Sequence, residues 1–400
     1  MSIDLLLLLP LALGHIALFV LIINVAHAVG YRGSAPDLCK IALLTGFTVG
    51  SGVLAWEACR DGMSVWSWPS LLYGAACVIT GLFLLPLSTT LLHLRNDPEG
   101  IRVQETTVDL GKTLGVENLV GEGKYAWMLK LKGNESFTLR KIECELALPN
   151  LPEALDGLTL LHISDIHLAP SFSRRFFEAV IEEALKFPAD LVLFTGDLVD
   201  DDGVIDWVVP LFSKLRGRLG TYSILGNHDF EHSPDLLARR LEDAGFTDLE
   251  GRWTTFETAG TTVALAGTSF PWGPPVPIAD RPRADYQILL SHAPDRFYWA
   301  EKKGFDLMLS GHNHGGQIRF PLIGAVFMPS VYSRRFDRGF FRKGKLTLHV
   351  SQGIAGKHPL RYGCPPEITR LTLKSIPVEP KKAKVSAHSE PLRGSLNDVR

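Results

Sequence analysis

The stretch "LTLLHISDIH", residues 158–167, passes from an apolar run to an aspartate and a histidine that stand one residue apart. A short leucine-rich run of this kind is typical of a strand buried on both faces. An amphipathic helical pattern, "SFSRRFFEAVIEEALKF" at 171–187, follows it, and "ADLVLFTGD" at 189–197 is a second strand of the same character. Strands that alternate with amphipathic helices predict an α/β fold built from βαβ units.

The alternation continues through "GTYSILGNHD" at 220–229, "YQILLSHAP" at 286–294 and "FDLMLSGHNHG" at 305–315. Each of these strands ends in polar residues. Because the carboxyl ends of strands form the ligand-binding edge of an α/β sheet, we expect five loops to meet there. The residues expected at this edge are Asp165, His167, Asp197, Asp200, Asn227, His228, Asp229, His292, His312 and His314.

Each of these motifs also has an ordinary structural interpretation. Asp165 and His167 could form a surface turn, "GDLVD" a turn followed by a helix cap, "GNHD" a turn with a left-handed Asn, and "SHAP" the start of a helix. The stretch "GHNHGGQ" at 311–317 is harder to explain in this way, because neutral imidazoles gain little from packing there. The five motifs together, each after an expected strand, predict a functional centre.

The series D-x-H, G-D-x-x-D, G-N-H-D, S-H and G-H-x-H-G-G-Q resembles the calcineurin-like metallophosphoesterase superfamily. The resemblance covers roughly residues 158–374 and includes "QGIAGKHPLRYGCPPEITRLTL" at 352–373. That ending, with the apolar N-terminus, resembles the membrane-associated bacterial branch of the superfamily. The fold it implies is a four-layered α/β sandwich, with two sheets flanked by helices.

The resemblance also implies a two-metal centre. One metal would be held by Asp165, His167 and His314, the second by Asn227, His292 and His312, and both by the bridging Asp197. Nitrogen and oxygen ligands without thiolate suit Mn, Fe or Zn better than Mg. Two metals about 3.5–4 Å apart can clamp the attacking and the leaving oxygen of a phosphoryl group. We therefore expect two divalent metal ions as cofactors.

His228 matches the histidine of the family that binds no metal and donates a proton to the leaving oxygen or stabilises the phosphoryl charge. We expect Asp229 to orient it, as a carboxylate behind a working imidazole does. Asp200 is expected to support the ligands rather than bind metal, and Arg361 to contact phosphate or form a surface salt bridge. Three histidines without motif support are predicted to be structural: His162, His349 and His358.

Three apolar segments precede this region, at 4–28, 38–58 and 68–92, and each is long enough to cross a bilayer. The first lacks the basic start of a signal peptide, so three transmembrane helices are predicted. The alternative is a two-span hairpin with one interfacial segment. Lys and Arg are concentrated in the first loop and after the third segment, which favours a multi-pass protein of the inner membrane with a cytoplasmic catalytic domain.

The sequence therefore divides into four expected parts: a membrane domain at 1–94, a β-rich connector at 95–157, a metallophosphoesterase domain at 158–375 and a disordered tail at 376–400. The 41 basic and 43 acidic residues give no basic excess, which argues against a nucleic-acid partner. The five cysteines form no C-x-x-C pair, so neither a disulfide framework nor a thiolate zinc site is expected.

The loop at 269–286, "SFPWGPPVPIADRPRADY", is long for a connection between core strands, and such loops are usually functional. Its apolar residues could face acyl chains, with Arg281 and Arg283 near a headgroup. The alternative is a proline-rich loop that only covers the domain.

The predicted function is hydrolysis of a phosphodiester or pyrophosphate bond by a membrane-bound enzyme. A lipid or lipid-linked phosphate is the expected substrate, and UDP-2,3-diacylglucosamine cleavage in lipid A synthesis is one activity that the resembling branch implies. A general phosphodiesterase, a protein phosphatase and a non-catalytic metal-binding membrane receptor remain as alternatives. The sequence does not identify a protein partner.

Overall fold

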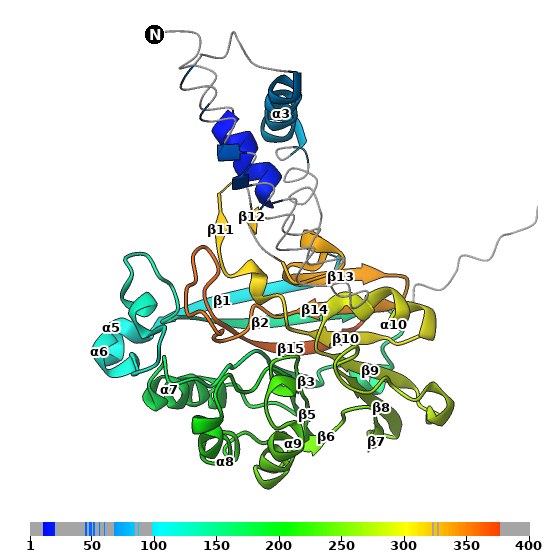
Figure 1. Ribbon diagram of the computed structural model, residues 1–400. Helices are drawn as coiled ribbons and strands as arrows, with labels where there is room; N and C mark the ends of the chain where they lie inside the picture. Colours follow the sequence, from blue (N-terminus) through cyan, green and yellow to red (C-terminus); the bar gives the residue numbers. More distant parts are fainter. Residues whose placement is uncertain are drawn as a thin grey trace, which may run out of the picture.

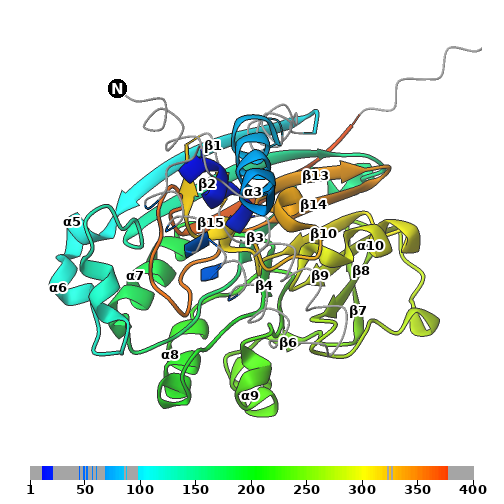
Figure 2. The ribbon, with the colours of Figure 1, turned by 45° about the horizontal axis from the view of Figure 1, so that its top comes forward.

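The computed structural model describes residues 11–20, 68–84, 87, 98–321, 324–325 and 328–376, with a few positions between 45 and 60. From residue 98 onward, a seven-stranded and a six-stranded sheet form the body of the molecule (Figures 1 and 2). A separate hairpin consists of β11 (Arg319–Phe320) and β12 (Gly324–Ala325).

The first sheet has the strand order β1-β2-β15-β3-β4-β5-β6. Its strands are β1 (Ile101–Asp109), β2 (Thr138–Leu148), β15 (Glu367–Ser375), β3 (Thr159–Ile163), β4 (Leu191–Thr195), β5 (Gly220–Ile224) and β6 (Thr247–Asp248). Strands β3 to β6 run parallel to one another, β15 runs antiparallel to β3, and β1 is antiparallel to β2. The parallel strands β3 and β4 are buried almost throughout, as their apolar sequences predict.

The second sheet has the order β13-β14-β10-β9-β8-β7. Its strands are β13 (Gly339–Lys343), β14 (Leu346–Val350), β10 (Leu307–Ser310), β9 (Tyr286–Ser291), β8 (Thr261–Thr268) and β7 (Trp253–Thr258). The four central strands are parallel, and each edge strand pairs antiparallel with its neighbour.

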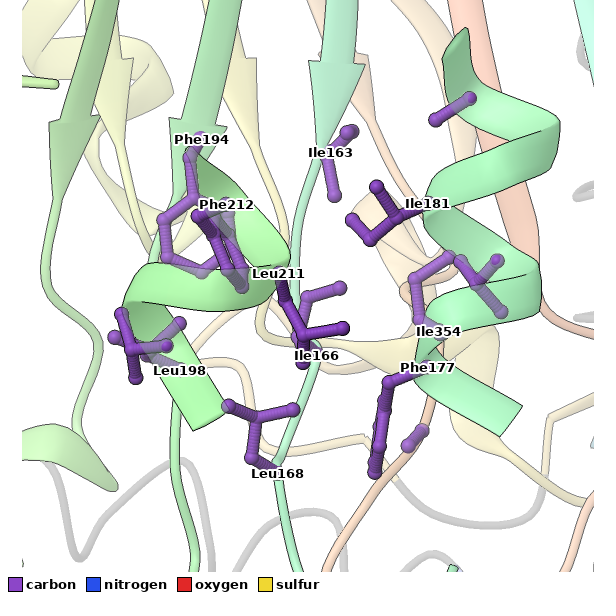
Figure 3. Close-up of a cluster of buried hydrophobic side chains, with 14 of the residues drawn as sticks. Ile163, Ile166, Leu168, Phe177, Ile181, Phe194, Leu198, Leu211, Phe212 and Ile354 are labelled. Carbon is purple, nitrogen blue, oxygen red and sulfur yellow. The ribbon is translucent and has the colours of Figure 1, made fainter. Parts of the chain in front are cut away.

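Three apolar clusters hold these layers together. The cluster between the sheets packs Leu160 and Leu193 of the first sheet with Ile288 and Leu309 of the second. The outer face of the first sheet is covered by α7 (Arg174–Leu185), α8 (Val208–Phe212) and α9 (Pro234–Asp243), over the core shown in Figure 3. Helix α10 (Phe297–Lys303) covers the second sheet. The order helix, sheet, sheet, helix is the expected four-layered α/β arrangement.

The covering helices follow from their sequences. Helix α7 buries Phe176, Phe177, Val180, Ile181 and Ala184, whose spacing places them on one face. Helix α9 begins with Pro234, which is preorganised for a first helical turn. Serines precede both helices, and neither caps its helix through a side-chain hydrogen bond.

The segment predicted as a separate β-rich connector, 95–157, is part of the first sheet. Strand β2 pairs in parallel with β15 along the whole of β15, and β1 pairs with β2. The boundary expected at residue 158 therefore does not separate two units. Within this segment the stretch "YAWMLKLKG" at 125–133, whose alternation predicts a strand, instead contains the 3₁₀ helix η3 (Ala126–Lys130). The short helices α5 (Leu110–Leu114) and α6 (Val116–Leu119) precede η3, and β2 follows it.

The first two predicted membrane segments lie mostly outside the described residues, as does almost all of the predicted disordered tail, whereas the third is described at 68–84 and 87. Residues 11–20 are helical, and α3 (Trp68–Ile79) continues into the π-helical turn η2 (Thr80–Leu84). The two helices touch where Nδ1 of His15 lies 2.5 Å from the hydroxyl of Tyr73. Among the described residues, none of the helices has both the length and the apolar character that crossing a membrane requires.

Candidate metal centre

The polar residues singled out in the sequence lie at one edge of the two sheets. Each follows the carboxyl end of a parallel strand: β3, β4 and β5 in the first sheet, β9 and β10 in the second. The side chains that meet there are those of Asp165, His167, Asp197, Asp200, Asn227, His228, His292, His312 and His314. The expected meeting of five strand-end loops therefore agrees with the geometry.

One group of side chains, here called the first half-site, consists of Asp165, His167 and His314. Nε2 of His167 lies 3.1 Å from Nε2 of His314, which in turn lies 3.3 Å from Oδ1 of Asp165. All three residues are buried. Nitrogen and oxygen lone pairs that converge in a buried space are stabilised by a cation between them, so this geometry fits a metal.

A second group, the second half-site, consists of Asn227, His292 and His312. Nε2 of His292 lies 3.0 Å from Oδ1 of Asn227 and 3.2 Å from Nδ1 of His312. Asp197 joins the two half-sites, because its Oδ2 lies 3.3 Å from Nε2 of His167 and 3.3 Å from Nε2 of His292. One carboxylate oxygen is thus placed equally far from a ligand-type nitrogen on each side.

Each imidazole uses its other nitrogen for an outward hydrogen bond. The four bonds run from His167 Nδ1 to Asp200 (2.9 Å), from His292 Nδ1 to the carbonyl of Thr195 (2.8 Å), from His312 Nε2 to the carbonyl of Pro329 (2.9 Å) and from His314 Nδ1 to the carbonyl of Ala355 (3.1 Å). Carboxylate and carbonyl oxygens only accept hydrogen bonds, so these nitrogens carry the protons. In the neutral form of each imidazole, the inward nitrogen then carries the lone pair that metal binding requires.

Neighbouring carboxylates raise the pKa of two of the imidazoles. Burial disfavours a charged His167, but Asp200 and Asp197 outweigh it and raise the pKa of His167 to about 9. Burial is likewise outweighed at His292, where Asp197 raises the pKa to about 9. The same pairing works against burial at Asp197 and holds its pKa well below the usual value, mainly through His292 and His167. In the metal-free protein, the protonated imidazoles of His167 and His292 therefore hold the carboxylates of Asp197 and Asp200 in place.

The other two imidazoles are neutral. Burial and the neighbouring His292 lower the pKa of His312 to about 3, and burial and His167 lower the pKa of His314 well below its ordinary value. Each half-site thus pairs one neutral imidazole with one that must lose a proton before it can bind metal. The donor set contains nitrogen and oxygen atoms and no thiolate. The ligand atoms lie within 4.8 Å of one another in each of two clusters, Asp165–His167–Asp197–His314 and Asp197–His292–His312.

The backbone at these positions is strained. Non-glycine residues with positive φ are uncommon, and each costs of the order of 1–3 kcal/mol unless the surroundings impose it. The ligand-type residues in this conformation are Asp165, His167, Asp197, His312 and His314, with φ between 46° and 67°. Such strain at neighbouring positions is typical of a functional site.

Two glycines let these loops approach one another. A Cβ at Gly311 would lie 2.0 Å from Oδ2 of Asp165, and one at Gly226 would lie 2.2 Å from Oδ1 of Asp197. Neither distance is possible for a side chain, so any other residue would displace a candidate ligand. The glycines of "GHNHGGQ" and "GNHD" therefore serve the close packing of the site.

His228 has a different carboxylate partner from the one expected. Its Nδ1 lies 2.6 Å from Oδ1 of Asp200, the residue that also accepts from His167. Asp229, predicted to orient His228, instead accepts hydrogen bonds from the backbone N–H groups of Leu198, Val199 and Gly226. Asp229 is fully buried and tethers the loop after β4 to the loop after β5. The orienting carboxylate is Asp200, and Asp229 is a loop brace.

Asp200, His167 and His228 could also be taken for a third metal group, since their ligand atoms lie within 4.8 Å of one another. Both contacts of Asp200 are hydrogen bonds to Nδ1 atoms. Because Nε2 of His167 already faces the first half-site, Asp200 supports the ligands from behind, as expected from the sequence.

Arg361 neither reaches the surface nor forms the predicted salt bridge. Its side chain is buried, and it donates to the carbonyls of Gln352, Cys364 and Ala355. Its Nη2 lies 3.3 Å from Nδ1 of His314. Arg361 therefore fixes the loop behind the first half-site and has no access to a phosphate.

His162 and His349 are structural, in agreement with the prediction. They are buried with their Nδ1 atoms 2.9 Å apart, and Nε2 of His162 lies 2.9 Å from the hydroxyl of Thr195. His358 differs from them, because it lines a cavity of about 390 Å³ beside the candidate ligands. Other residues at this cavity that the sequence did not single out are Asn313, Gln317, Ile318, Pro329 and Lys357.

The apolar face expected of the loop at 269–286 is divided, because Phe270, Pro274 and Pro275 are exposed whereas two other apolar residues face the core. Val276 belongs to the core beneath it, and Ile278 packs against that core. Arg281 donates to the carbonyls of Lys303 and Gly304 at the end of α10. Trp272 approaches the site, with its ring centroid 5.1 Å from that of His312.

Comparisons with known proteins agree with this geometry. The family model of the calcineurin-like phosphoesterases matches residues 158–316. The uncharacterized metallophosphoesterase YkuE of Bacillus subtilis is 32% identical over 238 residues, which are 56% of this chain and 82% of that protein. The phosphodiesterase YaeI of Escherichia coli is 30% identical over 224 residues, 54% of this chain and 81% of YaeI. A transmembrane protein with metallophosphoesterase domain from Danio rerio is 30% identical over 264 residues, 58% of this chain and 57% of that protein.

Proposed function

The chain belongs to the calcineurin-like phosphoesterase family and is a metal-dependent hydrolase of phosphoesters, and from this premise we propose that it cleaves a phosphodiester or pyrophosphate bond of a lipid-linked substrate. The proposal has two parts, the chemistry of the centre and the class of the substrate. The position of Asp197, with one oxygen 3.3 Å from a histidine nitrogen of each half-site, carries the first part.

Two divalent ions, Mn, Fe or Zn, fit the donor set. Asp165, His167 and His314 would hold one, Asn227, His292 and His312 the other, and Asp197 both. When bound, two such ions polarise the phosphoryl oxygens and lower the pKa of water. The outward hydrogen bonds of the four imidazoles keep their inward nitrogens aimed at this space before any ion arrives.

His228 supplies the proton for the leaving oxygen. Its Nδ1–H is held by Asp200, and its side chain lines the cavity. The Nε2 atom is therefore the one that can donate to a substrate, and Asp200 stabilises the imidazolium before transfer. Because Asp200 holds His167 as well, proton donor and metal ligand keep a fixed separation.

The substrate part of the proposal rests on the N-terminal sequence and on the cavity. The apolar segments at 4–28, 38–58 and 68–92 favour attachment to a membrane, with the catalytic domain on its cytoplasmic side. The Danio rerio and Bos taurus relatives are named transmembrane proteins. A cavity of about 390 Å³ leaves room for a phosphate and its polar substituents but not for long acyl chains, which would remain outside.

The test compares three substrates with the full-length protein in nanodiscs. We expect UDP-2,3-diacylglucosamine to be cleaved faster than UDP-glucosamine, and both rates to depend on added manganese. The third substrate, bis-p-nitrophenyl phosphate, measures the centre without any lipid preference. Equal rates on the acylated and the non-acylated nucleotide would leave a general phosphodiesterase, the activity for which YaeI is named. Full activity after chelation would contradict the metal centre.

A separate experiment tests on which side of the membrane the catalytic domain lies. Alkaline phosphatase fused to the C-terminus is active only outside the cytoplasm, so the proposal predicts an inactive fusion. A green fluorescent protein fused at the same site should fluoresce. Strong phosphatase activity would place the domain on the other side of the membrane.

A further inference from the structure

A basic and apolar segment lies exposed beside the cavity. It comprises residues 124–133, "KYAWMLKLKG", around η3. Its apolar side chains fall into a buried and an exposed group. Ala126 and Leu129 are buried, whereas Trp127 is 57% and Leu131 42% exposed. Exposed lysines at 124, 130 and 132 flank them, and the segment contains no carboxylate.

This segment is fixed to the wall of the cavity. The ring of Tyr125 lies 4.7 Å from that of His358, which lines the cavity. Directly after the segment, Asn134 donates to the carbonyl of Pro359 at 2.7 Å, and the N–H of Glu135 donates to the carbonyl of Arg361 at 2.8 Å. The segment therefore moves with the cavity rim.

Two further exposed aromatic residues extend this surface. Phe320 of β11 is 44% and Tyr362 45% exposed, and their rings lie 5.6 Å apart. A Cβ placed on Gly133 would lie 3.8 Å from Tyr362, so the segment and the aromatic pair are neighbours. We call this surface the rim patch; it consists of Trp127, Leu131, Phe320 and Tyr362, with Lys124, Lys130 and Lys132.

The rim patch lies on the side of the molecule that carries the N-terminal helices. In Figure 1, β11 and β12 project from the sheets toward the helix at 11–20 and α3. Trp and Leu partition to the boundary between headgroups and acyl chains, and lysines are attracted to anionic headgroups. Several lysines would repel each other across a symmetric contact between two copies, whereas an anionic surface pairs with all of them.

We propose that the rim patch docks on an anionic lipid bilayer, so that the cavity opens at headgroup level. This inference rests on the proposed function and deepens it, because it names the surface that brings a membrane-embedded phosphoester to the centre. The acyl chains of the substrate would stay in the bilayer while its phosphate enters the cavity.

The first experiment locates Trp127. Full-length protein and its Trp127→Phe variant are placed in nanodiscs that contain phosphatidylglycerol with brominated or ordinary acyl chains. We expect bromine to quench the fluorescence that the variant lacks. Equal Trp127 fluorescence in both lipids would overturn the docking, and this outcome does not depend on any substrate.

The second experiment measures how much the rim patch contributes to the rate on the acylated substrate. In Trp127→Ser/Leu131→Ser and in Lys130→Glu/Lys132→Glu, the rate on UDP-2,3-diacylglucosamine in anionic nanodiscs should fall roughly fivefold or more. The rate on bis-p-nitrophenyl phosphate, which shows that the variants fold, should stay unchanged. Leu236→Ser, which alters a 37% exposed leucine on α9, is the matched control and should leave both rates unchanged.

The outcomes separate the two proposals. If wild type cleaves no acylated substrate but Trp127 is quenched, the substrate proposal fails and the docking stands. If both double variants keep the wild-type rate on the acylated substrate, the patch does not serve the reaction and the inference is wrong. A smaller particle on sedimentation of Trp127→Ser/Leu131→Ser, with no quenching in wild type, would assign the patch to a second copy of the chain instead.

Discussion

The two half-sites use the same kinds of ligand but are supported by different groups. Behind His167 of the first half-site stands the carboxylate of Asp200, which also holds His228. Behind His292 of the second half-site stands only a backbone carbonyl, and its open side is covered by the ring of Trp272, 6.0 Å away. The first half-site is thus coupled to the proton donor, whereas the second is anchored to the sheet and shielded.

This difference indicates a division of labour. A negative charge behind an imidazole makes its other nitrogen a stronger donor to metal, while a carbonyl does so less. A change at Asp200 should therefore disturb one half-site and the proton donor together. Asp197 joins the two half-sites, so its loss should affect both of them alike.

The largest effect is expected from Asp197→Ala. Because its Oδ2 faces His167 and His292 alike, removing it should release both ions and reduce turnover to background. Elemental analysis and hydrolysis of bis-p-nitrophenyl phosphate measure the two losses. Asp235→Ala, which removes an exposed carboxylate on α9, serves as the control. Retention of one full metal equivalent by Asp197→Ala would show that the half-sites are independent.

His228→Ala should lower turnover by roughly 100- to 10,000-fold, the range for loss of a general acid. The metal content should stay near two equivalents, since the four imidazoles that face the half-sites remain. Metal loss as complete as that of Asp197→Ala would make His228 a ligand and contradict its role as proton donor.

The next comparison is between Asp200→Asn and Asp229→Asn. The first removes the charge behind His167 and His228 and should lower turnover roughly 10- to 100-fold. The second weakens a brace of three backbone hydrogen bonds and should cost about 1–3 kcal/mol of unfolding free energy. Denaturant unfolding and turnover of the metal-loaded variants separate the two effects. If Asp229→Asn lost as much turnover as Asp200→Asn at unchanged stability, Asp229 would have a catalytic role.

Asp200 and Asp229 show which part of the site could not be predicted from the sequence. Which residues meet at the sheet edge follows from strands that end in Asp, Asn and His, because parallel strands bring their carboxyl ends together. Which carboxylate then faces His228 depends on the course of two loops. The side chain of Asp229 turns inward to backbone N–H groups, and Asp200 approaches from the neighbouring strand end.

The first sheet also contains a strand pairing that could not be predicted from the sequence. The alternating pattern of "SFTLRKIECELALP" at 136–149 predicts a strand of the β-rich segment, and β2 lies within it. Its pairing with β15, near the other end of the catalytic region, is a long-range contact that no local pattern specifies. The strained backbone at Asp165 and His312 is likewise imposed by the assembled site and has no signature in the sequence.

The smallest effect expected is a pH dependence that distinguishes the half-sites. Without metal, the pKa values of His167 and His292 are about 9, so at pH 7 each ion must displace a proton from its half-site. Affinity should then rise about tenfold per pH unit for each ion up to pH 9 and level off above it. His312, whose pKa is about 3, and His314 are neutral throughout and add nothing to this slope.

In Asp200→Asn, the pKa of His167 loses the carboxylate that raises it most, whereas that of His292 depends on Asp197. One ion should therefore reach its plateau at lower pH while the other keeps the wild-type profile. Titration of the metal-free protein with Mn²⁺ by calorimetry, in buffers of different ionisation enthalpy, counts the protons released at each pH. Two unchanged profiles in Asp200→Asn would show that Asp200 does not set the charge of the first half-site, and that its support of His167 is only geometric.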